Sequence, residues 1–179
     1  MKPAFVFIGT SCSGKSTLSK RFADEFGLRR IDVVDFVLPL LPLRDAGEIT
    51  THEMLTIGYE GFFHMLMQED FDVIEVASDD PQKHLPGIAE IVKAHDRSMI
   101  VVFTDASFDD CVERNFTRPV NMQVPVDVLY QQAQYDRAFF VNMWGILKCP
   151  LVFVDTSSAR PLEESYVICI EMFQQFGLL

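Results

Sequence analysis

The sequence predicts an α/β fold built on a mainly parallel sheet with helices on both faces. Short apolar runs of strand length alternate with longer segments of helical periodicity from end to end. The chain has 179 residues, of which 49% are hydrophobic. This is enough to build one continuous core, so we expect a single domain over residues 1–179.

Strands and helices are expected to alternate along the chain, with two helices between the last two strands. The expected strands are 4–8, 28–34, 71–76, 98–103 and 151–154, and the expected helices are 15–26, 50–68, 82–94, 107–115, 126–147 and one opened by Pro161. Thr50 and Glu53 have the spacing of a capping box at the start of a helix. The apolar segment Phe36–Leu43 contains two prolines, so it should form neither a long regular helix nor an interior strand.

A glycine-rich segment directly follows the first expected strand and fits the P-loop pattern G-x-x-x-x-G-K-S. Glycines at its two ends let the chain curl, so that backbone N–H groups point inward at the phosphates of a nucleotide. Lys15 is expected to reach the β- and γ-phosphates, and the Ser16 hydroxyl is placed to bind Mg²⁺. The predicted phosphate-binding residues are Gly9, Thr10, Ser11, Cys12, Ser13, Gly14, Lys15, Ser16 and Thr17.

Composition excludes several classes of protein. The formal net charge of −11 argues against tight, non-specific binding to long nucleic acid. The sequence has no signal peptide and no apolar run of membrane-spanning length, so we expect a cytoplasmic protein. Cysteine and histidine spacings indicate neither a zinc site nor a disulfide framework. The adjacent pair Arg29 and Arg30 is expected to form a solvated corner between a helix and a strand.

Acidic residues follow or end two of the expected strands. Asp35 is a candidate base for an acceptor hydroxyl, although it could merely cap the following turn. Asp32 carries less weight, because strand alternation should point it elsewhere. Glu75 lies in an apolar strand, where it could orient Mg²⁺-bound water or hold a substrate group, or could face solvent at the strand end. Asp79 and Asp80 are expected to cap the next helix.

Two arginines, Arg114 and Arg118, lie four residues apart before a loop rich in Pro, Asn and Gln. On a continuing helix both guanidinium groups would emerge from one face and could close over a triphosphate. We therefore expect a lid at about 114–125. The alternative is a pair of surface arginines that answer an acidic helix. Arg137 is a weaker third candidate.

Taken together, these motifs resemble those of the polynucleotide-kinase-like and zeta-toxin-like P-loop kinases, with shikimate and gluconate kinases as more distant relatives. The likeness runs from Ala4 to about Ser157, and includes Val-Pro-Val-Asp-Val before a helix and Val-Phe-Val-Asp-Thr-Ser at the last strand. The resemblance implies a three-layer P-loop NTPase fold with strand order 2-3-1-4-5, and transfer of the γ-phosphoryl group of ATP, with Mg²⁺, to a hydroxyl.

The resemblance also assigns roles by position. Asp35 would be the general base, Arg114 and Arg118 the lid arginines, and Asp155 and Thr156 would lie near the adenine.

The chain departs from the pattern of those kinases at three positions. Leu38 stands where polynucleotide kinases usually carry an arginine that holds a substrate phosphate. Glu75 replaces a common aspartate, and Ser78 replaces a frequent asparagine. These changes weaken a nucleic-acid acceptor more than they weaken kinase chemistry.

We therefore expect a kinase that phosphorylates a hydroxyl of a small molecule, with Lys15, Asp35, Arg114 and Arg118 in the reaction and Ser16 and Glu75 near Mg²⁺. Two alternatives remain, a polynucleotide or nucleotide kinase and a non-catalytic nucleotide-binding module or switch. A GTPase-type switch is disfavoured because the sequence lacks N-K-x-D.

Overall fold

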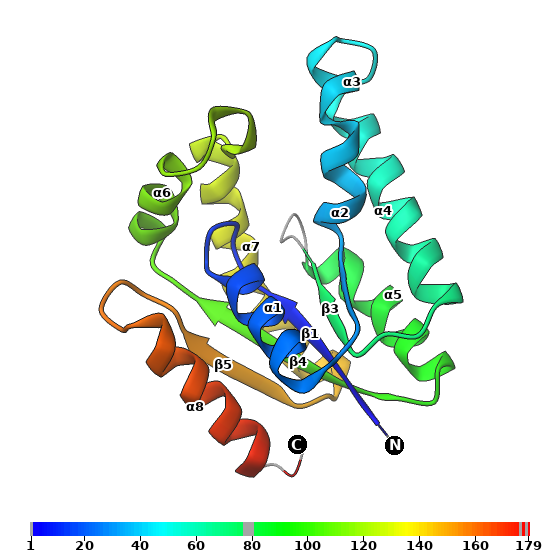
Figure 1. Cartoon of the computed structure of the whole chain (residues 1–179), viewed down its shortest axis with the longest axis vertical. Coiled ribbons are helices and arrows are strands. Elements are labelled where there is room, and N and C mark those ends of the chain that lie inside the picture. Colours follow the sequence, from blue (N-terminus) through cyan, green and yellow to red (C-terminus); the bar gives the residue numbers. More distant parts are fainter. Residues whose placement is uncertain (1, 77–80, 176, 178) are drawn as a thin grey trace.

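The computed structural model describes residues 2–76, 81–175, 177 and 179, and its centre is a five-stranded parallel sheet (Figure 1). The strands are β1 (Pro3–Ile8), β2 (Arg30–Asp32), β3 (Val73–Glu75), β4 (Ser98–Asp105) and β5 (Leu151–Asp155). Their order across the sheet is β2-β3-β1-β4-β5, and every neighbouring pair is parallel. The predicted α/β class, the parallel sheet and the strand order are thus confirmed.

Helices and short 3-10 turns connect the strands. They are α1 (Lys15–Phe26), α2 (Val34–Val37), η1 (Leu38–Leu40), α3 (Leu41–Asp45), α4 (Thr51–Gln68), α5 (Pro81–Ala94), α6 (Phe108–Phe116), η2 (Val120–Met122), α7 (Val126–Leu147) and α8 (Leu162–Gln175). Long crossovers of this kind are what parallel strands require. The helices expected at 15–26 and 126–147 have the predicted bounds.

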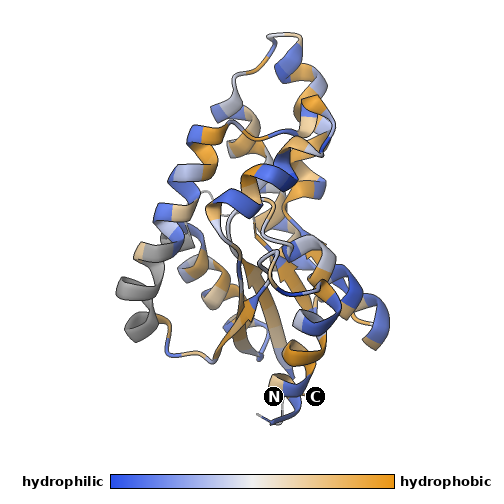
Figure 2. Ribbon diagram, turned by 90° about the vertical axis from the view of Figure 1, so that its left-hand side faces the viewer, coloured by the Kyte–Doolittle hydropathy of each residue, from blue (hydrophilic) through white to orange (hydrophobic). Residues whose placement is uncertain are grey.

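Two apolar cores lie on opposite faces of the sheet, because successive side chains of each strand point to opposite sides. Phe5 and Phe7 of β1 pack with α1 and α8, whereas Ala4, Val6 and Ile8 pack with α4 and α5. The result is three layers, with the sheet in the middle. Figure 2 shows the hydrophobic residues concentrated on the central strands, whereas the surrounding helices carry both hydrophobic and hydrophilic residues.

An arm formed by α2, η1, α3 and α4 rises beyond the carboxyl edge of the sheet (Figure 1). Pro39 and Pro42 lie in the first turns of η1 and α3, so the segment 36–43 is broken into short helices as its prolines predict. The expected capping box is present. The Thr50 side chain accepts a hydrogen bond from the Glu53 N–H, and the Glu53 carboxylate accepts one from the Thr50 N–H.

The structure corrects the bounds of the second strand. The sequence predicts a strand over 28–34 that ends near Asp35, but β2 ends at Asp32 and α2 begins at Val34. A hydrogen bond of 2.9 Å from the Val34 N–H to the Asp32 carboxylate accompanies this early turn. Asp35 therefore lies in the first turn of a helix rather than at a strand end.

The two arginines of the expected lid do not lie on one helix. Helix α6 ends at Phe116, so Arg114 and Arg118 do not share a continuous helix as the four-residue spacing suggests. The Arg137 side chain and the residues Ser78, Asp79 and Asp80 lie outside the described part, which leaves their expected roles untested. In the described part of the chain, no helix combines the length and apolar character needed to cross a membrane.

Phe22 of α1 should be a main contributor to stability. Its side chain is 1% exposed and its ring packs against those of Phe5 and Phe173 at centroid distances of 4.8 and 5.2 Å. Phe22→Ala should lower the free energy of unfolding by about 3–5 kcal/mol through lost burial and the cavity it leaves. Denaturant unfolding would measure this. The control is Phe26→Ala, whose side chain is 39% exposed on the same helix and which should cost less than half as much; equal losses would contradict the packing account.

Candidate functional site

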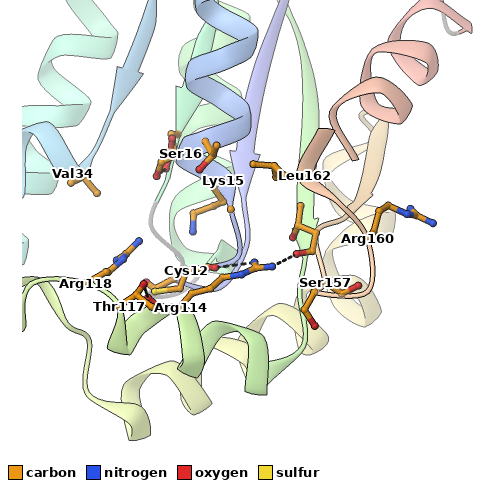
Figure 3. A pocket seen from close by; sticks show the side chains of 16 residues that line it. Cys12, Lys15, Ser16, Val34, Arg114, Thr117, Arg118, Ser157, Arg160 and Leu162 are labelled. Carbon is orange, nitrogen blue, oxygen red and sulfur yellow. Dashed lines mark hydrogen bonds between the residues drawn. The ribbon is translucent and has the colours of Figure 1, made fainter. Parts of the chain in front are cut away.

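A cavity of about 420 Å³ opens at the carboxyl edge of the sheet, where the P-loop joins β1 to α1. Residues from five parts of the chain meet there, and Figure 3 shows their side chains. Its lining residues are Ser11, Cys12, Gly14, Lys15, Ser16, Thr17, Val34, Glu75, Arg114, Thr117, Arg118, Thr156, Ser157, Ser158, Arg160 and Leu162. The volume lies within the range of small-ligand sites, and open parallel sheets bind ligands at this edge.

The loop from Gly9 to Thr17 has the backbone of a phosphate-binding turn. Gly9 and Gly14 have φ angles of 142° and 96°, which residues with a Cβ rarely adopt. A Cβ on Gly9 would lie 2.5 Å from the Thr104 carbonyl oxygen, so only glycine fits there. Gly14 precedes α1 and has no side chain to cap it. The N–H groups of the first turn of α1 are thus available to an anion.

Lys15 lies within the loop and is directed toward the cavity (Figure 3). Its ammonium donates hydrogen bonds to the carbonyl oxygens of Gly9 at 2.7 Å and Thr10 at 3.0 Å. Only 6% of the residue is exposed. A buried cation held by neutral carbonyl groups has no carboxylate partner among these contacts, so its charge is available to a phosphate.

The floor of the loop is fixed by hydroxyl groups from β4 and from the residue that follows β5. The hydroxyls of Ser13 and Thr104 lie 2.6 Å apart, and the Thr156 hydroxyl donates to the Ser13 carbonyl oxygen at 2.5 Å. All three residues are buried. These contacts link the loop to β4 and to the end of β5, and sequence reasoning identified only two of them, Ser13 and Thr156, as site residues.

Helix α7 braces the outer side of the loop. The Thr10 hydroxyl donates to the Asp136 carboxylate at 2.5 Å, and the Ser11 N–H donates to the Gln132 side-chain oxygen at 3.0 Å. Gln132 and Asp136 are four residues apart and therefore share one helix face. These two positions were missed by sequence reasoning, since no local pattern links residues more than 100 positions apart in the chain.

The two candidate lid arginines both line the cavity. Arg114 donates to the Thr156 carbonyl oxygen at 2.6 Å and to the Cys12 carbonyl oxygen at 3.3 Å, so it joins the P-loop to the loop after β5. Arg118 lies beyond the helix end, on the side of the cavity near Val34 (Figure 3). Both residues are partly exposed and both contribute to the cavity wall, which fits the expectation of lid arginines.

Asn115 closes the base of the loop that carries Arg118. Its side-chain nitrogen donates to the Val124 carbonyl oxygen at 2.8 Å, and its oxygen accepts from the Val124 N–H at 2.9 Å. The Cys12 thiol also lies 3.7 Å from that oxygen. Segment 116–123 is therefore a loop whose two ends are held together beside the P-loop.

The loop between β5 and α8 forms the far wall of the cavity. Thr156 lines the cavity, whereas Asp155 turns away, accepts the Ser157 N–H at 2.9 Å and lies 3.6 Å from Arg160. Asp110 of α6 accepts from the Ser158 N–H at 3.2 Å and thereby holds this loop beside α6. Of the two predicted adenine-side residues, the structure places Thr156 in the cavity and Asp155 next to it.

Glu75 ends β3 next to the P-loop strand and is 2% exposed, so the alternative of a solvent-facing residue is wrong. Its carboxylate accepts the Ser16 hydroxyl on one oxygen and the Ser19 hydroxyl on the other, both at 2.5 Å. Arg30 contacts the second oxygen at 2.6 Å. Glu75 thus lies beside the hydroxyl that the sequence assigns to Mg²⁺.

Two expectations around this cluster are overturned. Asp32 pairs with Arg30 and faces Glu75 in the next strand, because the two occupy matching positions in parallel strands. Arg30 is not a solvated corner, since its side chain is 19% exposed and is bound to both carboxylates, whereas Arg29 is exposed beside Glu69. Burial, and then the nearby Glu75 charge, raise the pKa of Asp32 to about 6. The signal was present in the two-residue spacing of Arg30 and Asp32, which places both on one strand face.

Asp35, the candidate base, lies exposed in the first turn of α2. It follows Val34, which lines the cavity, and its charge favours the ionised form of Arg30. Asp35 is thus a chain neighbour of a lining residue but does not itself line the cavity, whereas Lys15, Arg114, Arg118, Ser16 and Glu75 do.

The residues present fit a magnesium nucleotide. In the described part of the chain, no group of three or more His, Cys, Asp or Glu side chains could hold a metal by itself. Mg²⁺ in phosphoryl-transfer sites keeps most of its water and binds through phosphates and one or two protein oxygens. The Ser16 hydroxyl and the Glu75 carboxylate, at the open end of the P-loop, match that need.

Comparison with known proteins connects this geometry to a fold. No protein-family model and no curated protein sequence matches the chain. Solved structures, in contrast, do match the chain. A deoxyadenosine kinase from M. mycoides has a TM-score of 0.67 at 14% identity, over 96% of this chain and 99% of that one. A shikimate kinase from Aquifex aeolicus has a TM-score of 0.64 at 18% identity, over 98% of each chain.

A gluconokinase from Sinorhizobium meliloti has a TM-score of 0.60 at 18% identity, over 97% of each chain. The chain has the fold of the P-loop kinases. The strand order and the P-loop between β1 and α1 are the features that this likeness rests on. At these identities the P-loop kinase fold is shared, while the acceptor of each enzyme belongs to that enzyme alone.

Asp110 should stabilise the wall of the cavity in a pH-dependent way. Hydrogen bonds from Ser107 and Ser158 lower its pKa from 3.8 to about 2. A lowered carboxyl pKa adds stability that is complete above pH 4 and is lost as the pH falls toward 2. Asp110→Asn should therefore destabilise the protein at pH 7, and the difference from the parent should shrink between pH 4 and pH 2. Denaturant unfolding at several pH values measures this; a difference that does not vary with pH would contradict it.

Proposed function

We propose that the protein is an ATP- and Mg²⁺-dependent phosphotransferase that moves the γ-phosphoryl group to a hydroxyl of a small molecule. One observation carries the proposal. Lys15, Arg114 and Arg118, which come from three different elements, line one cavity at the open end of the P-loop. Phosphoryl transfer depends mainly on positioning and charge neutralisation, and this arrangement offers both.

In the proposed reaction each residue has a defined task. Loop N–H groups other than those of Ser11 and Ser13, together with those of the first turn of α1, bind the phosphates, and Lys15 neutralises the β- and γ-phosphate oxygens. Arg114 and Arg118 stabilise the charge that shifts during transfer. Ser16 and Glu75 hold Mg²⁺, which supplies further charge neutralisation when bound. Asp35 is the base that accepts the proton of the attacking hydroxyl.

The arm supports a small acceptor over nucleic acid. Residues 34–68 contain five acidic residues and one arginine, Arg44, which already pairs with Asp45 at 2.6 Å. A polyanionic backbone would find no positive groove on this arm, and Leu38 cannot neutralise a phosphate. The gluconokinase, shikimate kinase and deoxyadenosine kinase of the same fold are named for small acceptors.

Further parts of the proposal concern the chain as a whole. We propose that residues 1–179 form a single cytoplasmic domain in which about 114–125 acts as a lid over the nucleotide. We also propose, from the likeness of its motifs, that the chain is related to the polynucleotide-kinase-like and zeta-toxin-like kinases. Phosphorylation of 5′-hydroxyl oligonucleotides is the main competing activity.

An ADP-release assay over a panel of phosphorylatable metabolites, run beside 5′-hydroxyl oligonucleotides at low and moderate salt, tests the acceptor class. The proposal expects acceptor-dependent ADP release with at least one metabolite. Efficient, salt-sensitive phosphorylation of the oligonucleotides would assign a polynucleotide kinase instead. Tight ATP binding with slow turnover and no response to any acceptor would indicate a binding module or switch.

Lys15→Ala should abolish most phosphoryl transfer, with a loss of about a hundredfold or more in turnover, because its ammonium lies in the P-loop, where the β- and γ-phosphates are proposed to bind. Calorimetry and the turnover assay would measure ATP affinity and rate. Lys20→Ala is the matched control, since Lys20 is an exposed lysine on the same helix. Unchanged turnover in Lys15→Ala would refute the P-loop assignment.

Asp35→Asn should lower turnover by at least about a hundredfold while ATP affinity changes little, because the residue acts on the acceptor and keeps its shape. Steady-state kinetics with ATP calorimetry would separate the two effects. Asp24→Asn, an exposed carboxylate at the far end of α1, serves as the control. If Asp35→Asn instead loses ATP affinity, Asp35 belongs to the nucleotide side of the site.

A further inference from the structure

A cluster of charged and hydroxyl groups lies beside the P-loop, and its members Ser19, Asp32 and Glu75 are buried. Arg30 and Asp32 of β2, Glu75 of β3, and Ser16 and Ser19 of α1 form it. β2 and β3 are neighbours in register, with Asp32 opposite Glu75, and Ser16 and Ser19 are three residues apart on the helix that covers this face. The cluster is therefore a consequence of the fold around β3.

The hydrogen bonds within the cluster converge on Glu75. The same Arg30 nitrogen, Nη2, contacts the carboxylates of Asp32 and Glu75, while Arg30 Nε donates to the Ser19 hydroxyl at 2.9 Å. Ser19 in turn donates to one oxygen of Glu75, and the other oxygen of Glu75 accepts the hydroxyl of Ser16. Arg30 thus acts, directly and through Ser19, on the carboxylate that also binds Ser16.

We propose that Arg30 is a positioning residue for the metal side of this site, which holds the Glu75 and Asp32 carboxylates together and fixes Glu75 against the Ser16 hydroxyl. This inference rests on the proposed function, because it assigns a role in Mg²⁺ binding to a residue that does not line the cavity. It gives the Arg29–Arg30 pair two different tasks. Arg30 orders the site, and Arg29 is a surface residue paired with Glu69.

The physical need for Arg30 comes from burial. Glu75 is 2% and Asp32 5% exposed, and two neighbouring carboxylates with little water between them repel each other strongly. A planar guanidinium can bridge both acids and still donate to Ser19, whereas an ammonium is a single point charge without that fork. Without the bridge the two acids should separate, and Glu75 would no longer be fixed beside Ser16.

The consequence should appear in the metal dependence of nucleotide binding. Ser16 and Glu75 are the two groups proposed to hold Mg²⁺, whereas Lys15 and the loop N–H groups bind phosphates without a metal. Loss of Arg30 should therefore weaken ATP binding in Mg²⁺ and leave ATP binding in EDTA nearly intact. A residue that only supports the fold would change both equally.

The test compares Arg30→Gln, Arg30→Lys and the control Arg29→Gln by calorimetric titration of ATP, once with excess Mg²⁺ and once in EDTA. For Arg30→Gln we expect ATP binding about tenfold weaker in Mg²⁺ and within about twofold of the parent in EDTA. Arg30→Lys should restore only part of the ATP affinity that Arg30→Gln loses in Mg²⁺. Arg29→Gln should bind ATP as the parent does in both conditions. Circular dichroism and melting curves confirm that each variant is folded.

Several results would overturn the inference. If Mg²⁺ raises ATP affinity by the same factor in the parent and in Arg30→Gln, Arg30 has no role on the metal side. If Arg30→Gln binds ATP more tightly than the parent in Mg²⁺, Arg30 competes with the metal for Glu75. Equal losses in Mg²⁺ and EDTA would make the role structural. If Arg30→Gln does not fold, Arg30→Lys is the deciding variant. A gain in ATP affinity from Mg²⁺ that equals the parent's gain would then refute the bridge.

The same titrations, together with the turnover assay, distinguish failure of this inference from failure of the proposed function. A parent protein that binds ATP equally with and without Mg²⁺, or not at all, contradicts both proposals. A parent that shows the Mg²⁺ effect but transfers no phosphoryl group contradicts only the proposed enzyme activity.

Discussion

The open turn between β1 and α1 is the constraint on which the rest of the structure depends. The N–H groups that receive phosphate must face an open space, while the Ser11 and Ser13 N–H groups pair within the chain. Such an arrangement is stable only if the other side of the loop is held firmly. Hydroxyls of Thr104 and Thr156 hold the floor, and Gln132 and Asp136 hold the outer side. Strands β4 and β5 and helix α7 thus fix the geometry of a phosphate-binding loop.

Charge is distributed unevenly around this loop. The chain as a whole carries a net charge of −11, but the cavity wall contains Lys15, Arg114, Arg118 and Arg160. The one carboxylate on that wall, among the described residues, is Glu75, and it is already paired with Arg30. The site therefore attracts an anion locally even though the protein repels polyanions at long range.

Much of the fold was predictable because its signals are local. Strand and helix periods, the capping box at Thr50, and the P-loop spacing each depend on residues close in sequence, and all of them are observed. The direction of the Asp32 side chain was predicted wrongly. The strand was expected to continue toward Asp35, but the chain leaves it after Asp32 and turns into α2, so the alternation of side chains along a strand does not extend to Asp35. Gln132 and Asp136 act across more than 100 residues, and only the folded chain shows their contacts.

The central claim is that this loop binds the β- and γ-phosphates of a nucleotide. Calorimetric titration of the protein with ATP, ADP and AMP in the presence of Mg²⁺ tests it most directly, since the three ligands share a base and differ only in phosphates. The account predicts that AMP binds at least about a hundredfold more weakly than ATP, because it lacks the groups that Lys15 and the first turn of α1 contact. Equal affinity for AMP and ATP would contradict it.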